Sequence, residues 1–181
     1  MIRRICKYGE SVLRERARKV CYSDIAGTLP QLFGDMRETM NAAGGIGLAA
    51  PQVGLSLRIV VLKIKEGEVE KYLELINPEI VARSGSQIAE EGCLSLPGLF
   101  VEIERFAVVK VKAFNLKNIP LEITAGGLLA RALQHEVDHL NGKLIIDRVA
   151  PCLKPITLKR LRELRKHWLN QEQNPADERS V

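Results

Sequence analysis

The chain has 181 residues, of which 46% are hydrophobic, so it can bury one sizeable core but is short for two independent domains. Its longest apolar runs fall well short of the about 20 residues that cross a bilayer, and its basic first 18 residues lack the apolar stretch of a secretory signal. We therefore expect one cytoplasmic domain over residues 1–169, followed by a polar, flexible tail over residues 170–181.

The cysteines and the net charge exclude few further classes of protein. Four cysteines are scattered along the chain without a CxxC pair, which argues against a disulfide scaffold and against a zinc ribbon; they are Cys6, Cys21, Cys93 and Cys152. A net charge of +5 is a mild excess that soluble enzymes without anionic partners also carry. Charge alone therefore does not indicate a nucleic-acid partner.

The first half of the chain predicts a helix and a strand. Between Ser23 and Ala43, apolar residues recur at spacings of three and four, which is typical of an amphipathic helix, and Gly44 and Gly45 end it. Ser23 and Asp24 can cap its first turn. The run Leu57–Ile64 is rich in β-branched residues and predicts a strand.

The second half predicts a hairpin that leads into a helix. Val108 to Lys112 belong to an alternating run, 107–114, that is typical of a half-exposed strand, and residues 115–118 form a plausible turn. A strand over 120–124 follows. Leu128–Leu140 then has a helical pattern that Asn141 and Gly142 end.

A last amphipathic helix is predicted from Ile156 to about Leu169. Its apolar face contains Leu158, Leu161, Leu164 and Trp168. Its other face is basic, with a single acid, Glu163, among the five cations Lys159, Arg160, Arg162, Arg165 and Lys166. Most such charge runs are simply solvated surface.

The strongest chemical signal is the HExxH motif from His135 to His139 in the predicted 128–140 helix. Residues four apart share a helix face, so His135 and His139 can bind one cation while Glu136 lies beside its water. A chance HExxH in a structural helix is the competing interpretation. The chain has only three histidines, however, and burying two of them without partners would be costly. A metal would supply the partner.

A hydrolytic metal needs a third protein ligand and an open position for water. The metzincin proteases supply a third histidine, but this chain has Ile145 at that position. A thermolysin-like metalloprotease would need a downstream glutamate, for which Glu163 is the reasonable candidate. Metalloprotease activity therefore stays an alternative.

Three segments in this order closely resemble peptide deformylase. They are GIGLAAPQVG from Gly45 to Gly54, EGCLS from Glu91 to Ser95, and QHEVDH from Gln134 to His139. Leu13–Ala17, the Asn77–Pro78 step and Leu96–Gly98 extend the similarity over most of the chain before Trp168.

The resemblance implies an α+β fold, in which mostly antiparallel sheets surround a central HExxH helix, with an N-terminal and a C-terminal helix packed outside. It makes Cys93, on a strand facing that helix, the third metal ligand beside His135 and His139. A thiolate and two imidazoles suit several divalent ions. The family resemblance implies Fe2+ in the cell, with Zn2+, Ni2+ or Co2+ as possible substitutes.

The resemblance also implies a role for each catalytic residue. Glu136 would be the general base, while the side-chain amide of Gln52 and the backbone N–H of Leu94 would stabilise an oxyanion. Gly45 and Gly47 would let substrate backbone approach closely.

A methionine pocket is implied near Ile46, Leu128 and Ala132, with Glu91 and Arg105 as supporting polar residues. Arg131 falls where the family tends to be aliphatic. We expect its stem to line the pocket and its charge to reach water.

The expected activity is therefore hydrolysis of the N-formyl group of N-formyl-methionyl nascent peptides. Docking on the ribosome through the basic terminal helix is a further hypothesis, and neither a membrane nor sequence-specific nucleic acid is an expected partner. A relative without catalysis that binds metal or the ribosome is the alternative from another class. The joint presence of Glu136, Gln52 and Cys93 argues against it.

Overall fold

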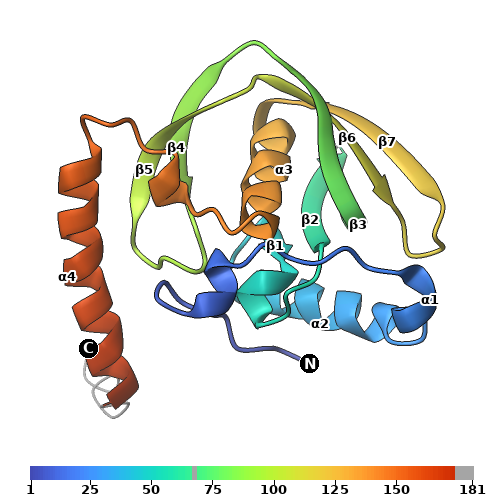
Figure 1. Ribbon diagram of the computed structural model, residues 1–181, viewed down its shortest axis with the longest axis horizontal. Coiled ribbons are helices and arrows are strands. Elements are labelled where there is room, and N and C mark those ends of the chain that lie inside the picture. Colours follow the sequence, from blue (N-terminus) through green and yellow to red (C-terminus); the bar gives the residue numbers. More distant parts are fainter. Residues whose placement is uncertain (67–68, 174–181) are drawn as a thin grey trace.

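The computed structural model describes residues 1–66 and 69–173, and it has an α+β architecture (Figure 1). Two antiparallel sheets, one of five strands in the order β1-β2-β3-β6-β7 and one of two strands, β4-β5, surround the helix α3. The strands are β1 (Gly47–Ala49), β2 (Ile59–Glu66), β3 (Val69–Ser84), β4 (Gln87–Gly92), β5 (Phe100–Arg105), β6 (Val108–Phe114) and β7 (Pro120–Gly126). The helices are α1 (Tyr22–Ile25), α2 (Leu29–Ala42), α3 (Gly127–Leu140) and α4 (Lys154–Gln173), with short 3-10 turns η1 (Ser11–Arg14), η2 (Ala50–Val53) and η3 (Ile145–Asp147).

Helix α3 is central because its apolar face packs on the five-stranded sheet. Ala130, Leu133 and Leu140 share a buried cluster with Val60 and Val111 of the sheet. The predicted end of the helix is confirmed. Gly142 adopts a positive φ of 70°, and a Cβ there would collide with the backbone carbonyl of Arg14, so only glycine fits the turn.

The predicted hairpin is confirmed, since β6 and β7 pair over their full length. Asn118 adopts a positive φ of 58° in the turn. The side-chain oxygen of Asn115 accepts hydrogen bonds from the backbone N–H groups of Lys117 and Ile119, each at 2.9 Å. Asparagine thus supplies both the left-handed conformation and the local side-chain bonds that fix the turn.

The long helix predicted from Ser23 to Ala43 is wrong in its first part. The segment forms two helices, α1 and α2, separated by residues 26–28, and Ser23 and Asp24 lie inside α1 instead of capping it. Pro30 explains the break, because a proline has no N–H for the carbonyl four residues earlier and is tolerated only in a first turn. The spacing of apolar residues continues through residues 26–28, so it predicts one helix where the structure has two.

The strands β1, β3 and β5 were not predicted, and β4 was expected only as the strand that carries Cys93. β3 is bulged, with register shifts between Ile76 and Glu79 and between Ile80 and Ala82. Asn77, at the first bulge, has a φ of 53°, and its side-chain amide bonds the backbone N–H and carbonyl of Val20 at 2.8 and 2.9 Å. Such bulges interrupt the two-residue alternation from which a strand is predicted.

Helix α4 packs outside the sheets on a separate buried cluster (Figure 1). Leu161 and Trp168 are buried in the same cluster as Leu13 and Ile145, and Leu158 and Leu164 pack against it, which confirms the predicted apolar face. The helix continues to Gln173, beyond the predicted end at Leu169. Residues 174–181 of the predicted tail lie outside the described residues.

Within residues 1–66 and 69–173, none of the helices combines the length and the hydrophobicity that a bilayer-crossing segment needs.

Candidate metal centre

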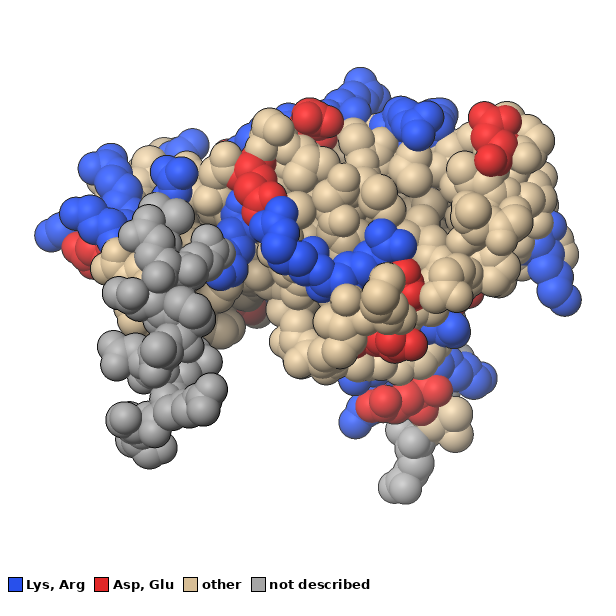
Figure 2. All heavy atoms as spheres, turned by 90° about the horizontal axis from the view of Figure 1, so that it is seen from below, with Lys and Arg blue, Asp and Glu red and all other residues tan. Residues whose placement is uncertain are grey.

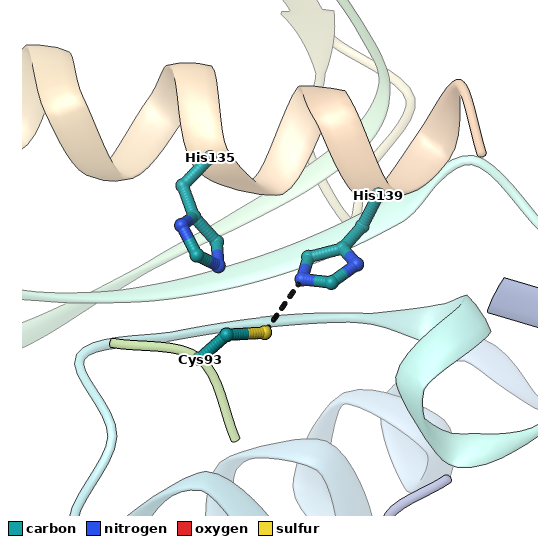
Figure 3. A group of neighbouring side chains, drawn as sticks. All are labelled: Cys93, His135 and His139. Atoms are coloured by element: carbon teal, nitrogen blue, oxygen red, sulfur yellow. Dashed lines mark hydrogen bonds between the residues drawn. The ribbon is translucent and has the colours of Figure 1, made fainter. Parts of the chain in front are cut away.

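Three donor side chains converge beneath α3. His135 and His139 lie one turn apart on the helix and Cys93 comes directly after β4, one residue beyond the strand on which we expected it. Figure 3 shows all three side chains pointing toward one another. The Cys93 sulfur lies 3.2 Å from Nε2 of His139, and one ligand atom from each residue falls within 4.8 Å of the others.

The donor set fits a divalent metal. Nδ1 of His135 is 3.1 Å from a carboxylate oxygen of Glu91. Nε2 of the same ring is therefore the nitrogen that can bind a metal. Donors at about 2.0 to 2.3 Å from a tetrahedral metal lie roughly 3 to 4 Å apart, close to the spacing seen here. Among the described residues, Cys93, His135 and His139 form the group that could hold a metal. Glu163 is exposed on α4, outside that group, so a thermolysin-like ligand set is excluded.

Glu136 lies beside the centre and is buried, with 4% of its surface exposed. Its Oε2 atom has no hydrogen-bond partner within the part of the chain that the structure describes. Burial raises the pKa of this carboxyl group to about 7. The group is thus able to exchange a proton near neutral pH, and one of its oxygens is available for a ligand.

Glu91 anchors His135 through a buried ion-pair network. Both oxygens of its carboxylate accept hydrogen bonds from Arg105, at 3.0 Å each, and Arg131 lies 3.1 Å from one of them. Burial raises the pKa of Glu91, but the hydrogen bonds from His135 and Arg105 outweigh it and hold the pKa at about 2. Glu91 is therefore a fixed anion that orients the imidazole of His135.

The expectation for the charge of Arg131 is wrong. Arg131 does line the pocket, but its guanidinium is buried and not in water. It donates a 2.8 Å hydrogen bond to the backbone carbonyl of Ala89 and pairs with Glu91. A buried cation needs such partners, and β4 supplies them.

Gln52 is held in η2 with its amide directed at the thiol. Its Oε1 accepts a 2.9 Å hydrogen bond from the backbone N–H of Ala49, which fixes which end of the amide faces the centre. Its Nε2 then lies 3.4 Å from Oγ of Ser95 and 3.7 Å from the sulfur of Cys93. Gln52 is 1% exposed, so the donor is rigid and shielded from solvent.

A pocket of about 600 Å³ opens next to the centre. It brings together every candidate residue except His139 and Arg105; the others are Gly45, Ile46, Gly47, Gln52, Glu91, Cys93, Leu94, Leu128, Ala132, His135 and Glu136. Two glycines set its shape. A Cβ at Gly47 would collide with the Glu136 carboxylate, and one at Gly45 would come within 2.9 Å of the Leu94 side chain.

Several lining residues were missed from the sequence. Phe100 of β5 is 53% exposed at the pocket, and a Cβ at Gly92 would come within 2.7 Å of its ring. Ile5 also lines the pocket, although it lies far from every motif in the sequence. A lone aromatic in an exposed strand has no sequence pattern that separates it from ordinary surface. The run from Leu96 to Gly98 lines the pocket too, and here the resemblance could have been used.

An HExxH helix whose third donor is a cysteine directly after a separate strand, with an amide donor and a buried glutamate beside it, defines a metal-dependent hydrolase of the amide-cleaving kind. Comparison with known proteins identifies the family within this class of hydrolase. Residues 2–154 match the model of the polypeptide deformylase family.

Similar proteins cover nearly the whole chain. A peptide deformylase of Elusimicrobium minutum is 46% identical over 173 residues, which are 92% of this chain and 98% of that protein. Peptide deformylase 1 of Clostridium acetobutylicum is 50% identical over 149 residues, which are 82% of this chain and 95% of the relative. The crystal structure of a Legionella pneumophila peptide deformylase superposes with a TM-score of 0.83 at 41% identity, covering 93% of this chain and 98% of that one.

The chain belongs to the peptide deformylase family. It is an enzyme whose reaction is the metal-dependent removal of the N-formyl group from nascent peptides.

Proposed function

We propose that Cys93, His135 and His139 bind one divalent metal ion, and that Glu136 is the general base of formyl hydrolysis. When bound, the metal would make hydroxide available near neutral pH and polarise the formyl carbonyl. Glu136 accepts the proton of the attacking water and passes it to the leaving amine, so that formate and a free methionine amino group are produced.

The observation that carries this proposal is the unpartnered Oε2 of Glu136. A buried carboxylate oxygen without a hydrogen bond destabilises a folded protein. Among the described residues, none donates a hydrogen bond to Oε2 of Glu136. A water between Glu136 and the three donors would do so. That water is the nucleophile in the proposed reaction.

The oxyanion of the tetrahedral intermediate needs donors that are already in place. We assign this role to Nε2 of Gln52 and to the backbone N–H of Leu94. The support is that Gln52 is locked by Ala49 with its N–H groups toward Cys93, and that Leu94 follows Cys93 directly along the pocket wall.

The methionine side chain of the substrate is proposed to enter the pocket beside Ile46, Leu128 and Ala132. Leu128 is 66% exposed and Ile46 is 43% exposed, so both present apolar surface that a substrate could cover. Glu91 and Arg131 close the polar side of the same pocket, paired with each other.

Fe2+ is the proposed metal in the cell, because an iron thiolate suits the donor set and the family resemblance implies it. Metal-free protein is reconstituted without oxygen with Fe2+ or Zn2+, and formate release from formyl-Met-Ala-Ser is followed before and after exposure to air. The iron protein is expected to be the faster and to lose activity in air, because its thiolate and metal oxidise. Equal, air-stable rates for the two metals would contradict the assignment.

We further propose that residues 1–169 act as one catalytic domain in the cytoplasm, where formylated chains are made. Docking on ribosomal RNA through α4 is proposed as well. Lys and Arg side chains gather at the end of the molecule that α4 forms (Figure 2). The exposed cations of α4 are Lys159, Arg160, Arg162, Arg165 and Lys166, and Arg165 also lies over the ring of Tyr8.

If α4 contacts phosphates, ribosome binding should weaken steeply as salt rises, by roughly one order in affinity per order in salt for each contact. Sedimentation with ribosomes at several salt concentrations measures this. The variant Arg160→Gln/Arg162→Gln should have a shallower slope, and Lys110→Gln/Lys112→Gln on β6 is a control of equal charge. Binding that does not change with salt would contradict docking on RNA.

A further inference from the structure

A second cleft, of about 770 Å³, is lined by the neighbouring face of α3. Gln134 and Asp138 face this cleft, whereas His135 and Glu136 face the catalytic pocket. Arg148, the residue directly after η3, lines the cleft together with Arg83 of β3. Gln134 and Asp138 belong to the QHEVDH motif, but the proposed reaction assigns no role to this cleft.

Asp138 is clamped between two guanidinium groups in this cleft. Nε of Arg148 donates to Oδ2 of Asp138 at 2.9 Å, and Nη2 of Arg148 donates to Oδ1. Arg105 donates to Oδ2 from the other side. The side chain of Asp138 is 7% exposed and that of Arg105 is 3% exposed, but that of Arg148 is 41% exposed. Arg148 is thus the solvent-facing end of the cluster.

The same Arg105 continues the cluster to the metal centre. Its other donors hold both oxygens of Glu91 at 3.0 Å, and Glu91 holds Nδ1 of His135 at 3.1 Å. An unbroken series of charge-assisted hydrogen bonds therefore runs from Arg148 through Asp138, Arg105 and Glu91 to a metal-facing imidazole. Hydrogen bonds behind a ligand fix its ring orientation and its basicity.

We propose that Arg148 is a positioning residue of the metal centre, which acts through Asp138, Arg105 and Glu91 on the orientation of His135. The proposal rests on the proposed ligand set of Cys93, His135 and His139. Its physical basis is the two-point grip on Asp138, since Oδ1 of Asp138 is held by Arg148 and Oδ2 is shared. Without that grip a buried carboxylate must find new donors, and Arg105 is the nearest. Any turn of Arg105 toward Asp138 loosens its paired hydrogen bonds to Glu91.

The test compares three variants of the full chain. Arg148→Met removes the charge and both donors and keeps much of the stem, whereas Arg148→Lys keeps the charge but cannot reproduce the two-point grip. Arg83→Met is the matched control, because it removes a cation from the same cleft, where Arg83 lies over the Phe106 ring at 4.8 Å.

Two quantities are measured for each protein: the dissociation constant of Co2+ by competition with a chromophoric chelator, and the NMR signal of the His135 Nδ1 proton in the Zn2+-loaded form. Arg148→Met is expected to raise the dissociation constant about tenfold, the lower end of the range for groups behind a metal ligand. It should also shift and broaden the His135 signal. The dissociation constant and the His135 signal of Arg148→Lys should be intermediate between those of Arg148→Met and wild type. Arg83→Met should match wild type in both measurements.

Unchanged metal affinity and an unchanged His135 signal in Arg148→Met would overturn the proposal, even if thermal stability falls, because the role would then be structural only. An equal loss in Arg83→Met would also overturn it, since the effect would be general electrostatics. The proposed ligand set is tested separately with His135→Ala in the same titration. If that variant binds Co2+ as wild type does, the ligand set itself fails.

Discussion

Replacing Glu136 with glutamine is expected to lower kcat for formyl-Met-Ala-Ser by at least about a hundredfold while the metal stays bound. The change keeps the shape of the side chain but removes its capacity to accept a proton, and burial at 4% exposure means that bulk water cannot readily take over. Stopped assays for formate measure kcat, and metal analysis of the same sample shows whether the centre is intact.

Glu163→Gln is the matched control for Glu136→Gln. It makes the same chemical change at an exposed glutamate of α4, so it should leave kcat within about twofold of wild type, as surface substitutions usually do. It also tests the protease alternative, which needed Glu163 as a ligand. A Glu136→Gln protein with full metal content and nearly unchanged kcat would rule out the general-base role.

Removing the thiolate is the second change with a large expected effect. Cys93→Ala should weaken metal binding by more than about a hundredfold, because even groups behind a ligand contribute about ten- to a hundredfold. Titration with Co2+ measures this directly, since coordination by the thiolate gives a charge-transfer absorption that Cys93→Ala would lack.

Cys152→Ala, at an exposed thiol just before α4, is the control for Cys93→Ala and should bind Co2+ as the wild type does. Retention of wild-type affinity and of the thiolate absorption in Cys93→Ala would show that the sulfur lies 3.2 Å from His139 without being a ligand.

The candidate metal centre could be proposed from sequence because its strongest element is local. His135, Glu136 and His139 share one helix, whose period fixes their relative positions. Cys93 and Gln52 come from distant segments, so only the resemblance to a family could join them to that helix. The structure places Cys93 3.2 Å from His139 and Gln52 3.7 Å from Cys93, and both line the pocket.

What could not be predicted depends on contacts between distant segments. The bulged strand β3 has no clean alternation, and the break between α1 and α2 was hidden by apolar residues that remain in phase across it. The guanidinium of Arg131 is buried because it binds Glu91 and the backbone carbonyl of Ala89, both on β4. No local sequence pattern around Arg131 indicates that β4 lies beside it. The hydrogen bond from Arg148 to Asp138 also joins residues on either side of the turn after α3, so it could not be predicted without the structure.

Formate release tests the central claim most directly. Metal-loaded protein prepared without oxygen is incubated with formyl-Met-Ala-Ser, and in parallel with a longer unformylated peptide that has internal bonds for a protease. We expect formate and free Met-Ala-Ser in equal amounts from the first and no cleavage of the second. Cleavage of the internal peptide, or no formate from folded and fully metallated protein, would contradict deformylase chemistry at this centre.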